Sequence, residues 1–210
     1  TSDAGGLLLG DINRGKRVIE RFARCFTDFR SHKLIDHKLK ELLAQRIYGI
    51  ALGYEDLNDH DQLRCDPLLA ALVGKTDPLG ESRKLKSDKG KAMAGKSTLN
   101  RLELTPADAG EKSRYKKIVY HPERIERFFV EMFLNSYKQA PEQIIIDPDT
   151  TDDAIHGNQE GSFFHGYYDK YCYLPLYIFC GDHLLGALLR SSNIDGAAGC
   201  LAELQRIIGQ

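Results

Sequence analysis

The stretch "IIIDPDTTDDAIHGNQEG", residues 144–161, places four aspartates directly behind three isoleucines. Three β-branched apolar residues in a row are typical of a buried strand. The aspartates at positions 147, 149, 152 and 153 repel one another unless a cation lies among them. The stretch therefore predicts either a solvated acidic loop or a cation site at the end of a strand.

Two of these acids, Asp147 and Asp149, lie two positions apart. In an extended strand their side chains point to the same face. Carboxylates fixed on a strand are good ligands for divalent cations, and a pair of cations held about 4 Å apart stabilises the attacking and leaving oxygens of a phosphodiester exchange. The spacing therefore makes Asp147 and Asp149 candidate metal ligands.

The residues that follow predict two more strands and a helix. The runs "YCYLPLYIFC" and "HLLGALLR" are strand candidates, and only Gly181-Asp182 separates them, which indicates a hairpin turn. The run "DGAAGCLAELQRIIG", 195–209, has the apolar spacing of a helix. A strand, a loop, a hairpin and a helix, in this order, are the elements with which a ribonuclease-H-like fold begins.

The chain before residue 141 is expected to be mainly helical. Apolar residues recur at helical spacing over 18–29 and 39–50, which predicts two amphipathic helices of about four turns within 13–52. Further helices are expected after Asp66-Pro67, over "STLNRLEL", and from Pro122 to near Pro141. The sequence thus predicts an α+β fold, with a helical region at 1–140 and the start of a ribonuclease-H-like domain at 141–210.

Composition excludes several classes of protein. With 42% hydrophobic and 28% charged residues, the chain has the composition of a folded globular protein. Its five cysteines form no C-x-x-C pair, which argues against a disulfide framework or a structural zinc site and favours a reducing cytoplasm. No run of 18 apolar residues and no signal-peptide pattern is found, so we expect no contact with a membrane.

Basic residues gather in the middle of the chain, within a loop expected at 74–117. The segment 81–96, "ESRKLKSDKGKAMAGK", holds six basic residues and two acids, and "EKSRYKK" follows at 111–117. Such a segment is either a solvated charged loop or a surface that faces phosphates. The phosphate-facing candidates are Arg83, Lys84, Lys86 and Lys89.

The same segment contains "GKAMAGKS", 90–97, which matches the P-loop pattern G-x-x-x-x-G-K-[ST]. A P-loop needs a buried strand before it and a full helix after it. The preceding "ESRKLKSDK" is too charged for a buried strand, and Pro106 keeps the following helix short. A P-loop nucleotide hydrolase is therefore a disfavoured alternative.

Several ordered motifs together resemble one family, the DDE transposases of bacterial insertion sequences, group 1. The resemblance is carried by "IDPDTTDD", "HGNQEG", "FFHGYYDKYCYLPL" and "LLR" with Arg190. In the first half of the chain "SDAGGLLL", "DFR", "GYEDLNDHDQLRCDP" and "GKSTLNRLE" are similar to the family in the same order. The resemblance covers nearly the whole chain.

The resemblance implies metal-dependent cleavage and joining of DNA strands. Asp149 matches the first acid of the catalytic triad, and Asp147 is the second choice. It implies Mg²⁺ or Mn²⁺ as the cofactor, bound weakly by this chain alone. His156, Gln159 and Glu160 belong to a recurring motif of the family, but the sequence assigns them no role.

The resemblance also implies double-stranded DNA, the ends of an insertion sequence, as the partner. Lysine and arginine contact phosphates, and asparagine and arginine contact base edges. The candidate DNA contacts are Lys96, Ser97, Thr98, Asn100 and Arg101, for which a surface loop capping a helix is the alternative. We further expect a homodimer in the transposition complex, in the bacterial cytoplasm and associated with the nucleoid.

The family's second aspartate and final glutamate are expected beyond residue 210, because such enzymes are about twice this length. We therefore expect this chain to be the amino-terminal portion of a transposase, with the DNA-binding role and an incomplete active site. The remaining alternative is a non-catalytic DNA-binding protein derived from a transposase.

Overall fold

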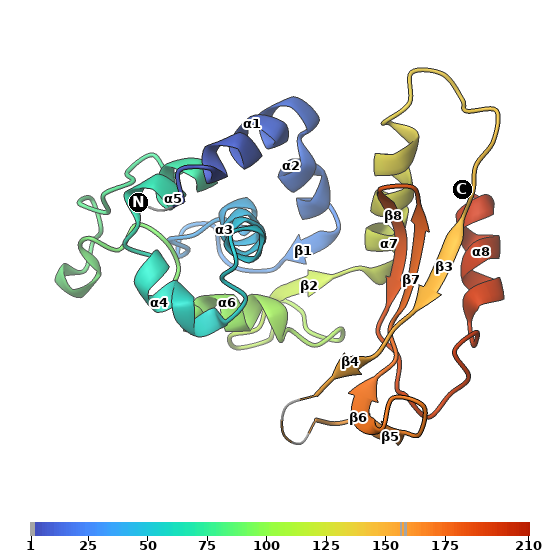
Figure 1. Cartoon of the computed structure of the whole chain (residues 1–210). Helices are drawn as coiled ribbons and strands as arrows, with labels where there is room; N and C mark the ends of the chain where they lie inside the picture. The colour runs from blue at the N-terminus through green and yellow to red at the C-terminus, as the bar shows by residue number, and fades with distance from the viewer. Residues whose placement is uncertain (1–2, 156, 158) are drawn as a thin grey trace. The chain divides into compact units, whose positions relative to one another are not determined.

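The computed structural model describes residues 3–155, 157 and 159–210, and the chain divides into two compact units. The first is Thr1–Pro122 and the second is Glu123–Gln210 (Figure 1). The sequence places a boundary at 140/141, whereas the contacts divide the chain at 122/123, because the helix that follows Pro122 packs with the second unit.

The first unit is mainly helical. Its helices are α1 (Gly6–Lys16), α2 (Val18–Ala23), α3 (Leu39–Ala51), α4 (His60–Leu63), α5 (Pro67–Val73) and α6 (Lys96–Glu103), with the 3-10 helices η1 (Leu57–Asp59) and η2 (Lys86–Asp88). Two short strands, β1 (Phe26–Asp28) and β2 (Ile118–Tyr120), pair antiparallel and join two parts of the unit that lie far apart in the sequence.

The core of this unit forms around α3, which lies among the other helices in Figure 1. Leu42, Leu43 and Tyr48 of α3 are buried, and they belong to one apolar cluster with residues of α2, α5 and α6. Burial of these side chains removes apolar surface from water, which is the main force that stabilises such a unit.

The prediction of a helix over 18–29 is only partly confirmed. The structure ends α2 at Ala23, and Phe26–Asp28 form β1 instead. Arg17, at φ 54°, separates α2 from α1. The apolar spacing is helical throughout, but pairing of Phe26 with Tyr120 gives the backbone hydrogen bonds of a strand, and such tertiary pairing overrides local preference. The helix expected after Asp66 is confirmed, because the Asp66 carboxylate accepts hydrogen bonds from the first N–H groups of α5.

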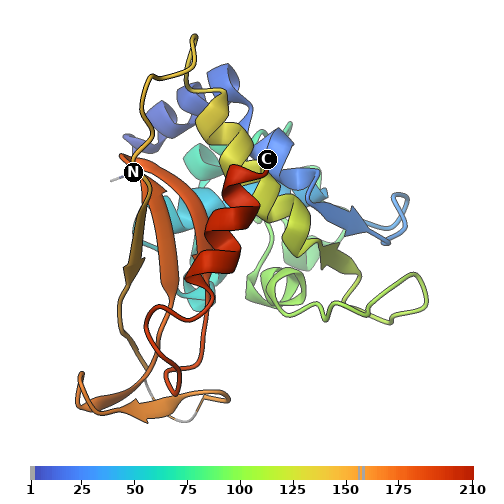
Figure 2. The same cartoon turned by 90° about the vertical axis from the view of Figure 1, so that its right-hand side faces the viewer.

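The second unit is a sheet with two helices. Its main sheet has the antiparallel order β3 (Asp147–Thr150), β7 (Leu176–Cys180), β8 (His183–Leu188). Helices α7 (Pro122–Leu134) and α8 (Cys200–Ile208) cover one face of this sheet (Figure 2). Phe133 of α7 and Ile207 of α8 are buried there against Ile178 of β7. The expected α+β class and the β7–β8 hairpin at Gly181-Asp182 are confirmed.

The strand expected at the three isoleucines, 144–146, is shifted toward the carboxyl end. Ile144 and Ile145 are 48% and 67% exposed, and only Ile146 packs against the core. Strand β3 starts at Asp147, so Asp147 and Asp149 lie within the strand, whereas Asp152 and Asp153 follow it. The shift has a physical reason: the backbone of Asp147–Thr150 pairs with Phe179–Leu176 of β7, and Ile144 and Ile145 lie before this pairing.

Two further differences concern the segment before β7 and the end of α7. The expected strand 171–180 is interrupted near Pro175, which has no N–H for a ladder hydrogen bond. Its first half, β6 (Lys170–Tyr173), forms a separate small sheet with β4 (Asp153–Ala154) and β5 (Phe163–His165), in the order β4, β6, β5. Helix α7 ends at Leu134 and not near residue 140.

The Arg190 side chain connects the ends of several elements in the second unit. It donates hydrogen bonds to the carbonyls of Leu174 (2.9 Å), Gly196 (3.1 Å) and Ala198, and to the hydroxyl of Thr150 (3.1 Å). Burial lowers the pKa of Arg190, but nearby acidic groups counteract this shift. Arg190 thereby fixes the carboxyl end of β3, directly beside Asp149.

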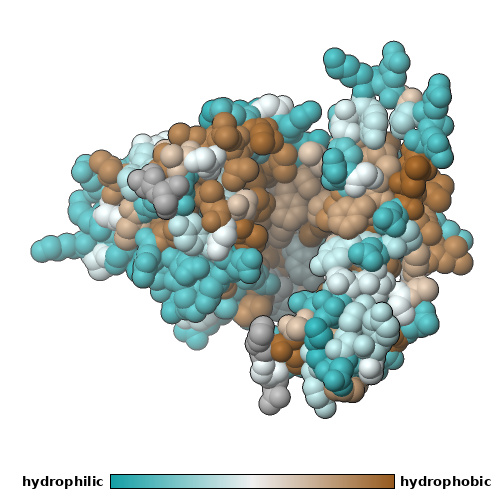
Figure 3. Space-filling view, in the orientation of Figure 1, coloured by the Kyte–Doolittle hydropathy of each residue, from teal (hydrophilic) through white to brown (hydrophobic). Residues whose placement is uncertain are grey.

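The surface of the first unit is uneven in character. Figure 3 shows hydrophobic surface over α1, where Leu7, Leu8 and Ile12 are 47%, 67% and 58% exposed. The surface around α4 and α6 is hydrophilic in the same view. Within the described residues, no helix has the length and apolar character needed to cross a membrane.

The segment before α6 is held to α3 by a buried amide. The Gln45 side chain donates to the carbonyl of Ala94 (2.7 Å) and accepts from the N–H of Ala94 (3.0 Å). Its amide nitrogen also lies 3.1 Å from Nδ1 of His60, and both side chains are buried. Gln45 thus satisfies three polar groups that have no access to water.

We expect Gln45→Leu to lower the free energy of unfolding by about 3 kcal/mol, because it leaves buried polar groups of Ala94 and His60 without partners. Gln62→Leu, at an exposed position of α4, is the matched control and should change the free energy by less than about 0.5 kcal/mol. Urea unfolding of the three proteins measures the difference. Equal stability of the two variants would contradict the role given to Gln45.

Candidate nucleic-acid interface

A basic groove crosses the first unit. It is a hollow of about 530 Å³, and we call it the basic groove. Its lining holds seven arginine and lysine side chains, namely Arg30, Arg64, Arg83, Lys91, Arg101, Arg114 and Lys117. Only two acids, Asp36 and Asp88, line it as well. Excess positive charge in a concave surface attracts an anionic chain.

Local structure positions Arg30 and Lys117 in the lining of the groove. Arg30 donates two hydrogen bonds, of 2.8 and 2.7 Å, to the carboxylate of Asp28. Burial raises the pKa of Asp28, but the hydrogen bonds from Arg30 outweigh it, so the pKa lies below its usual value. Because β1 pairs with β2, Arg30 and Lys117 are brought to the same groove from distant parts of the chain.

The structure separates the four phosphate-facing candidates. Arg83 lines the basic groove, 3.6 Å from the carboxylates of Asp36 and Asp88. Lys84 lines a neighbouring hollow of about 770 Å³. Lys86 lies in η2, and the ammonium of Lys89 donates to the carbonyl of Glu81 (2.7 Å). Arg83 also lines the hollow of Lys84, so these two residues lie together, whereas Lys86 and Lys89 line neither of the two hollows.

A second hollow lies beside helix α6. It has a volume of about 550 Å³, and we call it the α6 hollow; its lining is Leu57, Asn58, Lys96, Ser97, Asn100, Arg101, Tyr115 and Lys116. Ser97, Asn100 and Arg101 are exposed on α6, whose other side buries Leu99 and Leu102 in the core. The fifth candidate of this helix, Thr98, lines the basic groove instead.

Two residues, Arg101 and Tyr115, line both hollows and form the wall between them. The guanidinium carbon of Arg101 lies 5.0 Å from the centre of the Tyr115 ring, and that of Arg114 lies 4.9 Å from it. Such distances are those of cation–π contacts. Sequence reasoning did not assign Arg30, Arg64, Arg114 or Tyr115 to a site; the basic run at 111–117 was the only signal for the last two.

The geometry at Gly90–Ser97 disagrees with a P-loop. The residues before Gly90 form η2, and no strand precedes it within the described part of the loop. The N–H of Lys96, at the start of α6, donates to the carboxylate of Asp61 (3.1 Å). A negative side chain thus already occupies the helix end that a phosphate would need.

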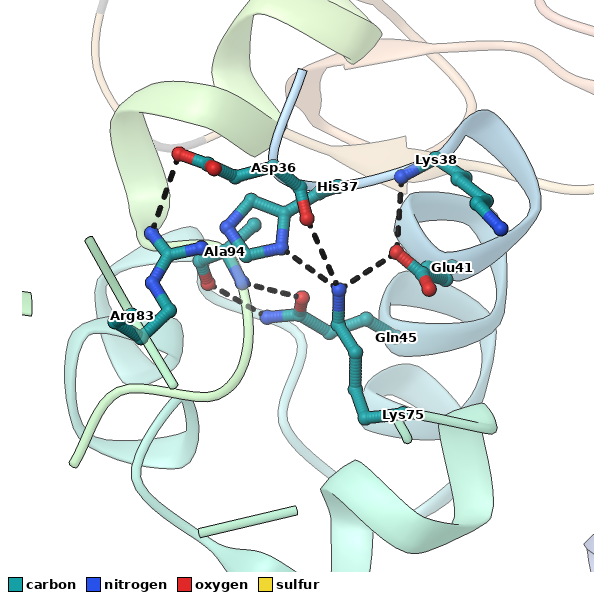
Figure 4. Close-up of polar contacts among 8 residues, drawn as sticks. All are labelled: Asp36, His37, Lys38, Glu41, Gln45, Lys75, Arg83 and Ala94. Atoms are coloured by element: carbon teal, nitrogen blue, oxygen red, sulfur yellow. Dashed lines mark hydrogen bonds and ion pairs between the residues drawn. The ribbon is translucent and has the colours of Figure 1, made fainter. Parts of the chain in front are cut away.

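A polar network supports the wall of the basic groove (Figure 4). The ammonium of Lys75 donates to the carboxylate of Glu41 (2.6 Å) and to Nδ1 of His37 (3.0 Å). An ammonium only donates, so Nδ1 of His37 accepts, which requires a neutral ring in the tautomer with the proton on Nε2. Burial, together with the charges of Lys75, Arg83 and Arg30, lowers the pKa of His37 from 6.5 to about 3.

The candidate metal ligands lie in the second unit, on β3. Asp147 is paired with Phe179 and Asp149 with Tyr177, and both acids are exposed. Tyr177 and Phe179 are half-buried, whereas Leu176 and Ile178, at the alternate positions of β7, are buried against the helices. The expectation that Asp147 and Asp149 share a face agrees with this register, and the face is the one turned away from α7 and α8.

The other residues of the acidic stretch make local contacts. The Asp152 carboxylate lies 2.7 Å from the ammonium of Lys170, whose hydrogen bond lowers the pKa of Asp152. The carbonyl of Glu160 accepts a hydrogen bond from the Tyr173 hydroxyl (2.5 Å). His156 and Asn158 of the "HGNQEG" motif lie outside the described residues.

The residues on β3 fit a divalent cation only in part. Asp147 and Asp149 offer the oxygen ligands that Mg²⁺ and Mn²⁺ prefer. Among the residues that the structure describes, however, no group of three or more histidine, cysteine, aspartate or glutamate side chains is close enough to hold a metal. Two carboxylates on one strand can contribute to such a site but do not complete it.

Comparison with known proteins gives one match. The family model described as "Transposase DDE domain group 1" matches residues 1–210. No curated protein and no solved structure matches the chain. The family match covers both units and agrees with the resemblance carried by the sequence motifs.

The neutral, buried His37 predicts a loss of stability in acid. The folded pKa of about 3 lies below the unfolded value, so the unfolded chain binds more protons as the pH falls through 6.5. We expect His37 to account for a loss of about 2 kcal/mol between pH 7 and pH 5. His37→Gln, which retains an acceptor for Lys75, should reduce this dependence, whereas His32→Gln at an exposed position should not. Urea unfolding at pH 7 and pH 5 gives the comparison. If the stability of the His37 variant depended on pH as strongly as that of the unaltered protein, the role given to His37 would be contradicted.

Proposed function

Because the chain belongs to the family of transposases with a group 1 DDE domain, we propose that it binds the double-stranded ends of an insertion sequence through the basic groove. The observation that carries this proposal is the groove lining, in which seven basic side chains stand against two acids. Contacts to phosphates supply most of the affinity of a protein for DNA and are independent of sequence.

Helix α6 supplies the contacts that depend on the DNA sequence. Its exposed Asn100 and Arg101 have the side chains that bond adenine and guanine edges, and Ser97 can donate or accept. Lys96 and Thr98 contact the backbone beside them, Thr98 from within the groove. Arg83 contacts phosphate in the groove, and Lys84, Lys86 and Lys89 extend the positive surface beyond it.

The second unit contributes acids for strand cleavage and transfer. The order β3, β7, β8 followed by α8 supports the assignment of this unit as the start of a ribonuclease-H-like fold. Asp149 is the first catalytic acid and a metal ligand, and Asp147 is a further ligand. A bound Mg²⁺ or Mn²⁺ would supply positive charge for the oxygens of the phosphodiester. Arg190 keeps Asp149 in place by bonding the hydroxyl of its neighbour Thr150.

A non-catalytic role in DNA binding is the second candidate. It is favoured by the incomplete set of acids among the described residues. In either role the protein acts on the DNA of the bacterial nucleoid, and a homodimer would hold two insertion ends together. A nucleotide hydrolase has no support, because Asp61 occupies the start of α6.

Neutralising three groove residues tests the DNA-binding role. We expect Lys91→Gln with Arg114→Gln and Lys117→Gln to weaken duplex binding more than about tenfold and to lower the slope of log K against log salt by about 2 to 3. The matched control changes Arg14, Lys16 and Arg17, which are exposed at the end of α1, to glutamine and should change both values much less. Fluorescence anisotropy at several salt concentrations measures them. Equal effects of the two triple variants would overturn the assignment of the groove.

Metal binding tests the role of Asp149. We expect this chain to bind Mn²⁺ weakly, with Kd of about 1 mM or above, because two carboxylates replace few of the cation's waters. Asp149→Asn should weaken binding further and Asp147→Asn less, whereas Asp182→Asn, at the exposed β7–β8 turn, should have no effect. Enhancement of water proton relaxation by Mn²⁺ measures the binding. A larger effect of Asp147→Asn would exchange the two roles, and DNA cleavage by this chain alone would contradict an incomplete site.

A further inference from the structure

The α6 hollow is concave, whereas paired bases present their edges at the floor of a groove. A protein reads these edges with a protruding helix or strand that enters the groove. A concave surface encloses a base that has left the stack more completely than it contacts the edge of a paired base. The concavity of about 550 Å³ beside α6 is therefore a shape for an unstacked base.

The chemistry of the lining fits the same ligand. Bases stack on aromatic rings and on guanidinium planes, and the wall of the hollow offers both in Tyr115 and Arg101. Tyr115 is 55% exposed, so its ring is accessible to a ligand. Ser97 and Asn100 add a hydroxyl and an amide group, which can bond the edge of a base.

The α6 hollow lies next to the basic groove, in which the DNA backbone is proposed to lie. Arg101 and Tyr115 line the hollow on one side and the basic groove on the other. Arg114, in contact with the same ring, lines only the groove. A nucleotide whose phosphate lies in the groove can therefore place its base across this wall and into the hollow.

We propose that the α6 hollow binds a single unpaired base of the DNA whose backbone lies in the basic groove, with Tyr115 as the stacking residue. This proposal rests on the proposed DNA-binding function and adds to it the preferred form of the ligand. It makes DNA with an unpaired base next to a duplex a better ligand than fully paired DNA.

The test compares two DNA ligands of equal length and charge, one fully paired and one with a single unpaired base, which is 2-aminopurine. The protein should bind the second DNA about five- to hundredfold more tightly, the range that stacking of one base supplies, and binding should change the 2-aminopurine fluorescence. Tyr115→Ala should bring the ratio of the two dissociation constants to about one, and Tyr115→Phe should retain it. Asn100→Ala should lower the ratio in part.

Lys91→Gln, in the groove but outside the hollow, is the control: it should weaken binding of both ligands and leave their ratio unchanged. A ratio near one for the unaltered protein, or a high ratio that persists in Tyr115→Ala, would overturn the proposal. Either outcome together with salt-dependent duplex binding would leave the proposed function intact. If the protein bound neither of the two DNA ligands, the DNA-binding role itself would be contradicted.

Discussion

The paired hydrogen bonds between the Gln45 amide and the backbone of Ala94 determine the geometry of the first unit. They hold the segment 92–95 in the core, where Ala92, Met93 and Ala94 are buried, so that α6 begins at a fixed place. Both hollows depend on this start, because α6 lines the one and borders the other. A buried amide that satisfies both backbone groups of one residue specifies register more strictly than apolar contacts do.

Arg190 has the corresponding role in the second unit. Its guanidinium bonds three carbonyls and the hydroxyl of Thr150, which no shorter or single-pronged donor could reach together. The turn before α8 and the end of β3 are thereby fixed relative to β7. Asp147 and Asp149 stay on the exposed face of the sheet, because Thr150, in the same strand, is turned inward and held.

The basic side chains of the groove repel one another, and an anionic ligand would reduce this repulsion. Seven basic side chains converge there; Arg30 is paired with Asp28, and Arg83 lies 3.6 Å from the carboxylates of Asp36 and Asp88. The same positive charges help to keep His37 neutral, since protonation would add another cation beside Lys75. Binding of a polyanion offsets this repulsion, and the interaction weakens with salt because binding releases the counterions of the polyanion.

Local signals in the sequence determined the elements whose reasons are local. The cap at Asp66, the hairpin turn at Gly181-Asp182 and the apolar stripes of α3, α7 and α8 follow from spacing and turn chemistry, and the ordered motifs alone indicated the family. Only the tertiary structure decided the strand at Phe26, the shift of β3 onto the acids, and the meeting of Arg30, Arg101 and Tyr115 at one surface. Arg30 meets residues of the basic groove that lie 70 or more positions away in the sequence, and the position of β3 depends on its pairing with β7. Pairing across such distances leaves no periodic pattern in the sequence, because the tertiary packing of the unit, and not the neighbouring residues in the sequence, decides which segments pair.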